Sequence, residues 1–193
     1  MDIKTLRTEN KTLVLEIGPN QKPQAQFVPE YKDAKIITLD IDAEQKPDIV
    51  CDAGQLPGEL DGLLDGVFAS HVLEHFSYWQ TVQVLKGWIK TLKPGGALHV
   101  AVPSWEWSAR EVLAENPSPA LYAHTFAGQI NEHDAHLSMF TMRRLRALFE
   151  QCGLSVTRAR TGIYHLVAAD GQLHEAEQHY ICGVKGAPPL EKE

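Results

Sequence analysis

The sequence predicts an α/β fold with a doubly wound, mostly parallel sheet. Residues 64–69 form an apolar run typical of a buried parallel strand, and a polar corner follows at residues 70–75. Residues 78–91 carry apolar side chains at helical spacing, and Pro94-Gly95-Gly96 breaks this helix before a second apolar run at residues 97–103. Strand, corner, helix, turn and strand make one βαβ unit, and ligands bind beyond the carboxyl ends of the strands in such sheets.

The N-terminal part predicts the other half of the sheet. Strands are expected at residues 12–17 and 35–39, and each ends in a polar corner. A shorter extended piece at residues 48–51 follows the second strand too closely for a helical crossover of a dozen residues. We therefore expect abbreviated helices at this sheet edge, near residues 20–50.

The C-terminal part predicts one more helix and two strands. Thr141 is a plausible N-cap for a helix over residues 142–152, which Gly153 would end. Residues 154–159 and 180–184 have the apolar character of the last two strands. We expect them to form a hairpin joined by a long loop.

Composition restricts the class of protein. The 193 residues, 44% of them hydrophobic, fit a single domain, which we assign to residues 1–186, with residues 187–193 as a disordered tail. A net charge of -7 disfavours a nucleic-acid partner held by bulk electrostatics.

The cysteines and the apolar runs restrict the compartment. Cys51, Cys152 and Cys182 are far apart and show no paired metal spacing, which favours a reducing cytoplasm. No apolar run approaches the roughly 18 residues of a membrane helix, so we expect no membrane insertion.

The ordered corners of the sheet resemble those of a known family. An acidic residue precedes the first corner, acids end the second and third strands, and Ser-His follows the fourth. The chain is similar, over about residues 13–153, to class I S-adenosylmethionine-dependent methyltransferases, closest to small methyltransferase-type-11-like members. The matching stretches are Asp52-Ala53-x-x-Leu56-Pro57, Ser70-His71-Val72-Leu73-Glu74-His75 and Leu92-Lys93-Pro94-Gly95-Gly96. The resemblance implies a Rossmann-like sheet, bound S-adenosylmethionine, and S-adenosylhomocysteine as product.

The first corner would receive the methionine end of the cofactor. Gly18 has no side chain to obstruct the approach, and Glu16 matches the acidic residue that would face the ammonium group. Asn20 stands where the family's second glycine is expected; asparagine tolerates left-handed backbone, and Pro19 would stiffen the turn. A plain strand-to-loop turn is the alternative.

The next corners would hold the nucleoside. Asp40 could accept hydrogen bonds from both ribose hydroxyls, with Asp42 as the competitor. Asp52 and Ala53 match the adenine corner, and an Asx turn before Pro57 is the alternative for Asp52. The predicted cofactor-binding residues are Glu16, Ile17, Gly18, Pro19, Asn20, Asp40, Ile41, Asp52, Ala53, Gly54, Leu56, Ser70 and His71.

His71 is the predicted catalytic residue, because it follows the fourth strand directly. Neutral histidine could take a proton from a hydroxyl or amine acceptor, and a structural hydrogen-bonding role is the alternative. We expect Glu74 and His75 to cap the helix or orient His71.

Two metal patterns compete with this interpretation. His71-x-x-Glu74-His75 matches a zinc-peptidase pattern, but that pattern lies inside a helix in such enzymes, whereas here it abuts a strand. His133-x-x-His136 is a second possible metal pair, but it lies in a polar segment. We therefore predict that neither pattern binds a metal. A nicotinamide oxidoreductase is disfavoured because no Gly-x-Gly-x-x-Gly follows Glu16.

The segment 104–138 is the predicted lid over the acceptor. Its Trp105 and Trp107 could instead pack a helix or a dimer contact. We expect a small-molecule or glycan-type acceptor, and a homodimer is a further expectation. A noncatalytic cofactor-binding module of the same fold is the main alternative. A basic face of arginines for a macromolecular acceptor is another, formed by Arg143, Arg144, Arg146, Arg158 and Arg160.

Overall fold

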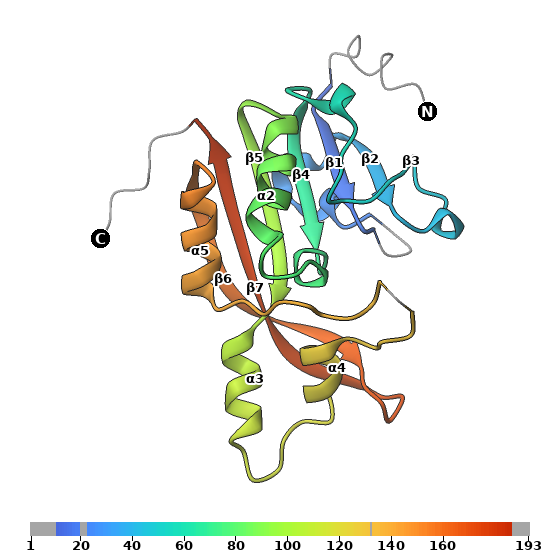
Figure 1. Ribbon diagram of the computed structural model, residues 1–193, viewed down its shortest axis with the longest axis vertical. Helices are drawn as coiled ribbons and strands as arrows, with labels where there is room; N and C mark the ends of the chain where they lie inside the picture. Colours follow the sequence, from blue (N-terminus) through green and yellow to red (C-terminus); the bar gives the residue numbers. More distant parts are fainter. Residues whose placement is uncertain (1–10, 20–22, 132, 187–193) are drawn as a thin grey trace.

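The computed structural model describes residues 11–19, 23–131 and 133–186, so Asn20 and the tail 187–193 lie outside the described residues. One seven-stranded sheet runs in the order β3-β2-β1-β4-β5-β7-β6 (Figure 1). The first five strands are parallel, and β7 pairs antiparallel with both β5 and β6. The strands are β1 Leu13–Ile17, β2 Lys35–Asp40, β3 Ile49–Val50, β4 Leu64–Ser70, β5 Leu92–Pro103, β6 Leu154–Val167 and β7 Leu173–Lys185. The predicted α/β fold with a mostly parallel sheet is confirmed.

Two helices cover one face of the sheet. Helix α2 (Thr81–Thr91) and helix α5 (Met142–Gln151) contribute buried side chains to the same core as the strands. The predicted cap of α5 is confirmed, because Thr141 Oγ1 accepts the Arg144 amide at 3.1 Å. Helix α2 begins three residues later than predicted, after a turn in which the Gln80 side chain accepts the amide and hydroxyl of Ser77.

The opposite face has short 3-10 turns where longer helices could lie. Turns η1 (Ala25–Phe27) and η2 (Pro29–Tyr31) pack a smaller cluster against β1 and β4, as expected from the abbreviated edge. The Glu16 carboxylate accepts the amides of Gln24 at 2.6 Å and Ala25 at 2.9 Å. An acidic side chain on β1 therefore fixes the start of η1. The remaining 3-10 turns are η3 Ala43–Gln45, η4 Gly58–Leu60 and η5 Leu73–His75.

The Pro94-Gly95-Gly96 turn differs from its prediction. It lies within the bounds of β5 as an irregularity, because the pairing of β4 with β5 passes from Leu64–Leu92 to Gly66–Ala97. Gly95 adopts a φ of +81°, which favours glycine. The chain thus turns between helix and strand while sheet pairing continues on both sides.

The prediction of a long loop between the last two strands was wrong. Strands β6 and β7 pair continuously up to Val167 and Leu173, and only residues 168–172 form the turn. The outer halves were missed because their apolar residues are interrupted by polar ones, and several of them, such as Ile163, Val167 and Leu173, are exposed and belong to no buried run.

Two helices of the segment 104–138 pack on this extended hairpin. Helix α3 (Trp105–Val112) and helix α4 (Leu121–Phe126) lie beside the hairpin, below the parallel strands in the view of Figure 1. Trp107 and Leu121 form a separate apolar cluster with Ala176 of β7. Trp107 therefore packs a helix, the alternative left open by the sequence, whereas Trp105 is about half exposed. None of the helices in the described ranges has the length and apolar character needed to cross a membrane.

Candidate functional site

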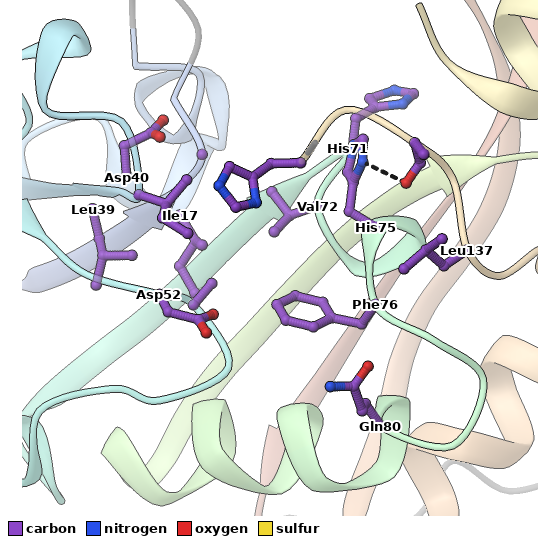
Figure 2. A pocket seen from close by; sticks show the side chains of 15 residues that line it. Ile17, Leu39, Asp40, Asp52, His71, Val72, His75, Phe76, Gln80 and Leu137 are labelled. Atoms are coloured by element: carbon purple, nitrogen blue, oxygen red, sulfur yellow. Dashed lines mark hydrogen bonds between the residues drawn. The ribbon is translucent and has the colours of Figure 1, made fainter. Parts of the chain in front are cut away.

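A pocket of about 390 Å³ opens at the carboxyl ends of β1, β2 and β4. Figure 2 shows Asp40 and Asp52 on one side, His71, His75 and Leu137 on the other, and Phe76 between them. The volume lies within the range of small-ligand sites, roughly 300–1,000 Å³. The lining residues are Ile17, Gly18, Leu39, Asp40, Ile41, Asp52, Ala53, His71, Val72, His75, Phe76, Gln80, His133, Ala135 and Leu137.

The first corner is closed to any side chain at Gly18. Its φ is +64°, and its amide donates to the Leu39 carbonyl at 2.8 Å. A Cβ atom there would lie 2.7 Å from Val72 Cγ2. The backbone of β1 and the corner after β4 therefore approach each other closely, so packing against Val72 by itself requires glycine at this position.

Two acids line the pocket on consecutive corners. Asp40 ends β2, and its Oδ1 accepts the Asp42 amide at 2.9 Å. Asp52 Oδ1 accepts the Gly54 amide at 2.7 Å, which is the Asx turn that the sequence left as an alternative. The two interpretations of Asp52 are compatible, since a carboxylate has about four acceptor sites. Both side chains fit hydroxyl and amine donors of a nucleoside.

Some predicted cofactor residues lie outside this pocket. Glu16 is buried, and its carboxylate is occupied by the amides that start η1; burial raises its pKa although those amides act in the opposite direction. Pro19 lines an adjoining hollow with Asp40, and Ser70 lines a separate cavity with Phe68 and Tyr180. Leu56 packs against the main core, and Gly54 holds the Asp52 turn.

His71 is held in a strained and fully partnered position. Its φ of +57° is uncommon for a residue with a side chain, and its amide donates to the Ala101 carbonyl at 2.9 Å. Its Nδ1 lies 3.2 Å from Glu74 Oε1, and its Nε2 lies 2.8 Å from Gln178 Oε1. Burial lowers the pKa of His71, but the hydrogen bond and charge of Glu74 outweigh it, so the pKa lies above its usual value. The contact agrees with the expectation that Glu74 orients His71.

Glu74 is a buried carboxylate in a histidine-rich surrounding. Burial opposes its ionisation, but His71 and His136 together hold its pKa below the usual value. Its backbone carbonyl accepts the amides of Leu137 and Ser138 at 2.8 and 3.0 Å. These two bonds fasten the end of the segment 104–138 to the corner after β4.

Several pocket residues were missed by the sequence interpretation. Val72, Phe76 and Gln80 belong to the same corner as His71 but carry no ionisable group, and only their position in the fold reveals them. His133, Ala135 and Leu137 come from the predicted lid, of which only these last residues line the pocket. Helices α3 and α4 instead pack on the β6–β7 hairpin.

The zinc-peptidase interpretation finds no support in this geometry. Residues 71–75 pass from the end of β4 into the 3-10 turn η5, outside any α-helix. Both ring nitrogens of His71 already have side-chain partners.

Comparison with known proteins identifies the family. Residues 4–159 match the family model described as a methyltransferase domain. No curated protein matches the sequence at a significant level. A methyltransferase from Methanosarcina mazei, described as S-adenosylmethionine-dependent, superposes with a TM-score of 0.63 at 17% identity and covers 99% of each chain.

Two further solved structures share the fold and differ in their acceptors. One is a 1,6-didemethyltoxoflavin N1-methyltransferase from Burkholderia thailandensis, solved with its substrate and S-adenosylhomocysteine (TM-score 0.59, 13% identity, 92% of this chain and 72% of that chain). The other is a 16S rRNA adenine-1408 N1-methyltransferase from Catenulisporales acidiphilia (TM-score 0.60, 13% identity, 97% and 93%). Because the family match spans most of the chain, this protein belongs to the class I methyltransferases and is an S-adenosylmethionine-dependent enzyme.

Proposed function

We propose that the enzyme transfers a methyl group to a small-molecule or glycan-type acceptor that enters beside His71 and residues 133–137. The single observation behind this proposal is the pocket itself. Asp40 and Asp52 lie on one side and His71, His75 and Leu137 on the other (Figure 2), so donor and acceptor can meet between them. The acceptor would enter this pocket either as a whole small molecule or as the terminal group of a glycan.

The residues of the pocket suit the cofactor. Gly18 leaves the backbone bare for the methionine portion, Asp40 is placed to accept from the ribose hydroxyls, and Asp52 from the adenine amine. Ile41 and Phe76 add apolar surface for the adenine ring. The bound cofactor supplies an activated methyl group, so the main task of these side chains is alignment.

His71 stands at the wall where the acceptor would lie. Its Nε2 contacts Gln178, so accepting a proton there requires the acceptor to displace the Gln178 amide. A hydroxyl acceptor could make that exchange because it can both donate and accept. We therefore assign His71 to the acceptor and the two acids to the cofactor.

The charge of the protein supports an acceptor other than a nucleic acid. The net charge is -7, and three of the five arginines considered for a basic face have separate partners. Arg158 pairs with Glu30, Arg144 lies over the Tyr78 ring, and Arg160 lies over the Tyr180 ring. The three cysteines are free thiols, which supports a reducing cytoplasm. A homodimer stays a prediction.

The assignment of donor and acceptor sides is tested by paired variants. Asp40→Ala should abolish measurable binding of S-adenosylhomocysteine, whereas Asp42→Ala, two residues away, should retain it. His71→Ala should keep cofactor affinity and lower turnover with any acceptor found in a screen. Unchanged cofactor affinity in Asp40→Ala would remove the ribose assignment.

A further inference from the structure

Glu74, His75 and His136 form a cluster that the cofactor pocket does not explain. One ligand atom from each residue lies within 4.8 Å of the other two. Glu74 Oε1 lies 3.2 Å from His71 Nδ1, whereas Glu74 Oε2 and His136 Nδ1 are buried and have no hydrogen-bond partner among the described residues. A buried carboxylate oxygen without a partner is costly, and a bound cation is one of the few ways to compensate it.

We propose that Glu74, His75 and His136 bind a divalent transition-metal ion in the acceptor wall of the pocket, where the ion also holds an oxygen donor of the acceptor. This inference deepens the proposed function. The role of the ion in holding the acceptor rests on that function, whereas the metal site itself does not.

The donor set selects the kind of ion. One carboxylate oxygen and two imidazole nitrogens suit Zn²⁺, Mn²⁺, Fe²⁺ or Co²⁺, whereas Mg²⁺ and Ca²⁺ prefer oxygen ligands throughout. Three protein ligands leave at least one coordination position open, as in catalytic rather than structural zinc sites. His136 Nε2 lies 3.9 Å from Glu74 Oε1, close to the roughly 3.4 Å that separates two ligands of a tetrahedral ion.

The surroundings of His75 match those of a metal ligand. Its Nδ1 lies 3.2 Å from the Ala135 carbonyl, so Nδ1–H can donate there and leave Nε2 free to bind. Ligating histidines commonly donate their second ring nitrogen to a backbone carbonyl. His75 also packs edge-on against His136, with ring centroids 4.9 Å apart.

The position of the cluster relates it to the acceptor. His75 lines the cofactor pocket, while Glu74 and His136 lie buried behind it. Figure 2 places His75 on the side of the pocket away from Asp40 and Asp52, so an ion held by all three residues would lie at this wall. An oxygen-bearing acceptor could bind there, next to the methyl group that the cofactor carries.

The proposed ligand set differs from both metal patterns visible in the sequence. His71 is excluded because Glu74 and Gln178 occupy its ring nitrogens. His133 is excluded because it is exposed and lies outside the cluster. The site instead combines two adjacent residues of η5 with one residue from the segment 104–138, a combination that only the folded chain creates.

Direct metal binding tests the proposal without any acceptor. The full chain is stripped with a chelator and titrated with Co²⁺, whose visible absorption reports the coordination, and then with Zn²⁺ in competition. We expect one ion per chain that Zn²⁺ displaces. Glu74→Gln, His75→Ala and His136→Ala should each weaken binding by at least about tenfold, while His133→Ala should bind as the unmodified protein does.

Two controls separate the possible failures. Thermal melting shows whether each variant folds, and if Glu74→Gln does not, the two histidine variants carry the test. Absence of stoichiometric uptake, or uptake unchanged in His75→Ala and His136→Ala, would overturn the metal site. Calorimetric binding of S-adenosylhomocysteine to the metal-free protein tests the proposed function separately, because retained cofactor binding without metal uptake defeats only this inference.

Discussion

The Trp88 indole donates a hydrogen bond to the Ala53 carbonyl at 2.8 Å, and this bond joins helix α2 to the corner at Asp52 and Ala53 that lines the pocket. Trp88 is fully buried in the main core. The same side chain therefore packs the sheet and fixes part of the pocket that we propose as the cofactor site.

Replacing Trp88 should affect stability and cofactor binding together. Trp88→Phe leaves the Ala53 carbonyl without its donor, and we expect a loss of about 2 kcal/mol in the free energy of unfolding. Cofactor affinity should fall as the corner loosens. Denaturant unfolding and calorimetry measure the two effects, and Trp79→Phe, at a position 86% exposed, should change stability by less than about 0.5 kcal/mol. Equal effects of the two substitutions would contradict this account.

Two glycines with the same backbone conformation allow the cost of backbone strain to be measured separately from the cost of steric crowding. Gly18 and Gly62 have φ values of +64° and +65°, but only Gly18 faces a close neighbour, Val72 Cγ2. Gly62→Ala should cost about 1 kcal/mol of backbone strain. Gly18→Ala should cost about 1–3 kcal/mol more from overpacking and should weaken cofactor binding.

A double variant checks the cause of the Gly18 effect. Adding Val72→Ala to Gly18→Ala removes the atom that the new Cβ would meet, so part of the lost stability should return. If the stability loss of the double variant equals the sum of the losses of the two single variants, crowding against Val72 does not cause the Gly18→Ala effect.

Acid sensitivity should arise in part from His99 on the opposite face of the sheet. Burial lowers the pKa of His99 from 6.5 to about 4, and its ring contacts the hydroxyls of Tyr31 and Tyr180 at 3.0 and 2.5 Å. The folded chain therefore resists a proton that the unfolded chain accepts below pH 6.5. The contribution of His99 to the free energy of unfolding is therefore constant above pH 6.5. As the pH falls toward 4, this contribution lowers the free energy of unfolding by up to about 3 kcal/mol.

Removing His99 should flatten this pH dependence. His99→Gln should reduce the difference in unfolding free energy between pH 7 and pH 4.5 by about 2 kcal/mol, measured by denaturant unfolding at both pH values. His124, whose pKa burial also lowers to about 4, should maintain part of the remaining slope. His165→Gln, at an exposed position, provides the control, and an identical slope in all three proteins would exclude the contribution of His99.

The parallel half of the sheet could be predicted because each of its strands is marked by a short apolar run within the sequence itself. Residues 13–17 and 64–70 are mostly apolar and mostly buried on both faces, and each run ends where a polar corner begins. The corners after them share one edge by topology, so Asp40, Asp52 and His71 could be placed together before any coordinates were known.

The rest depended on contacts between distant residues. The outer hairpin of β6 and β7 is stabilised by cross-strand pairing and by Trp107 from another segment, and neither leaves a periodic signal in the sequence. The same is true of the Glu74 cluster, because His136 reaches it from a segment fastened by the backbone bonds of Leu137 and Ser138. Glu16 shows that a residue can match the expected sequence position and still have another role, since its carboxylate holds the start of the turn η1.

Calorimetric titration of the purified protein with S-adenosylmethionine and S-adenosylhomocysteine, with NAD as the matched control, tests the central claim most directly. The account predicts micromolar binding of both sulfur nucleosides at one site per chain and no binding of NAD. Failure of both nucleosides to bind would contradict the assignment of the pocket between Asp40 and His71 as the cofactor site.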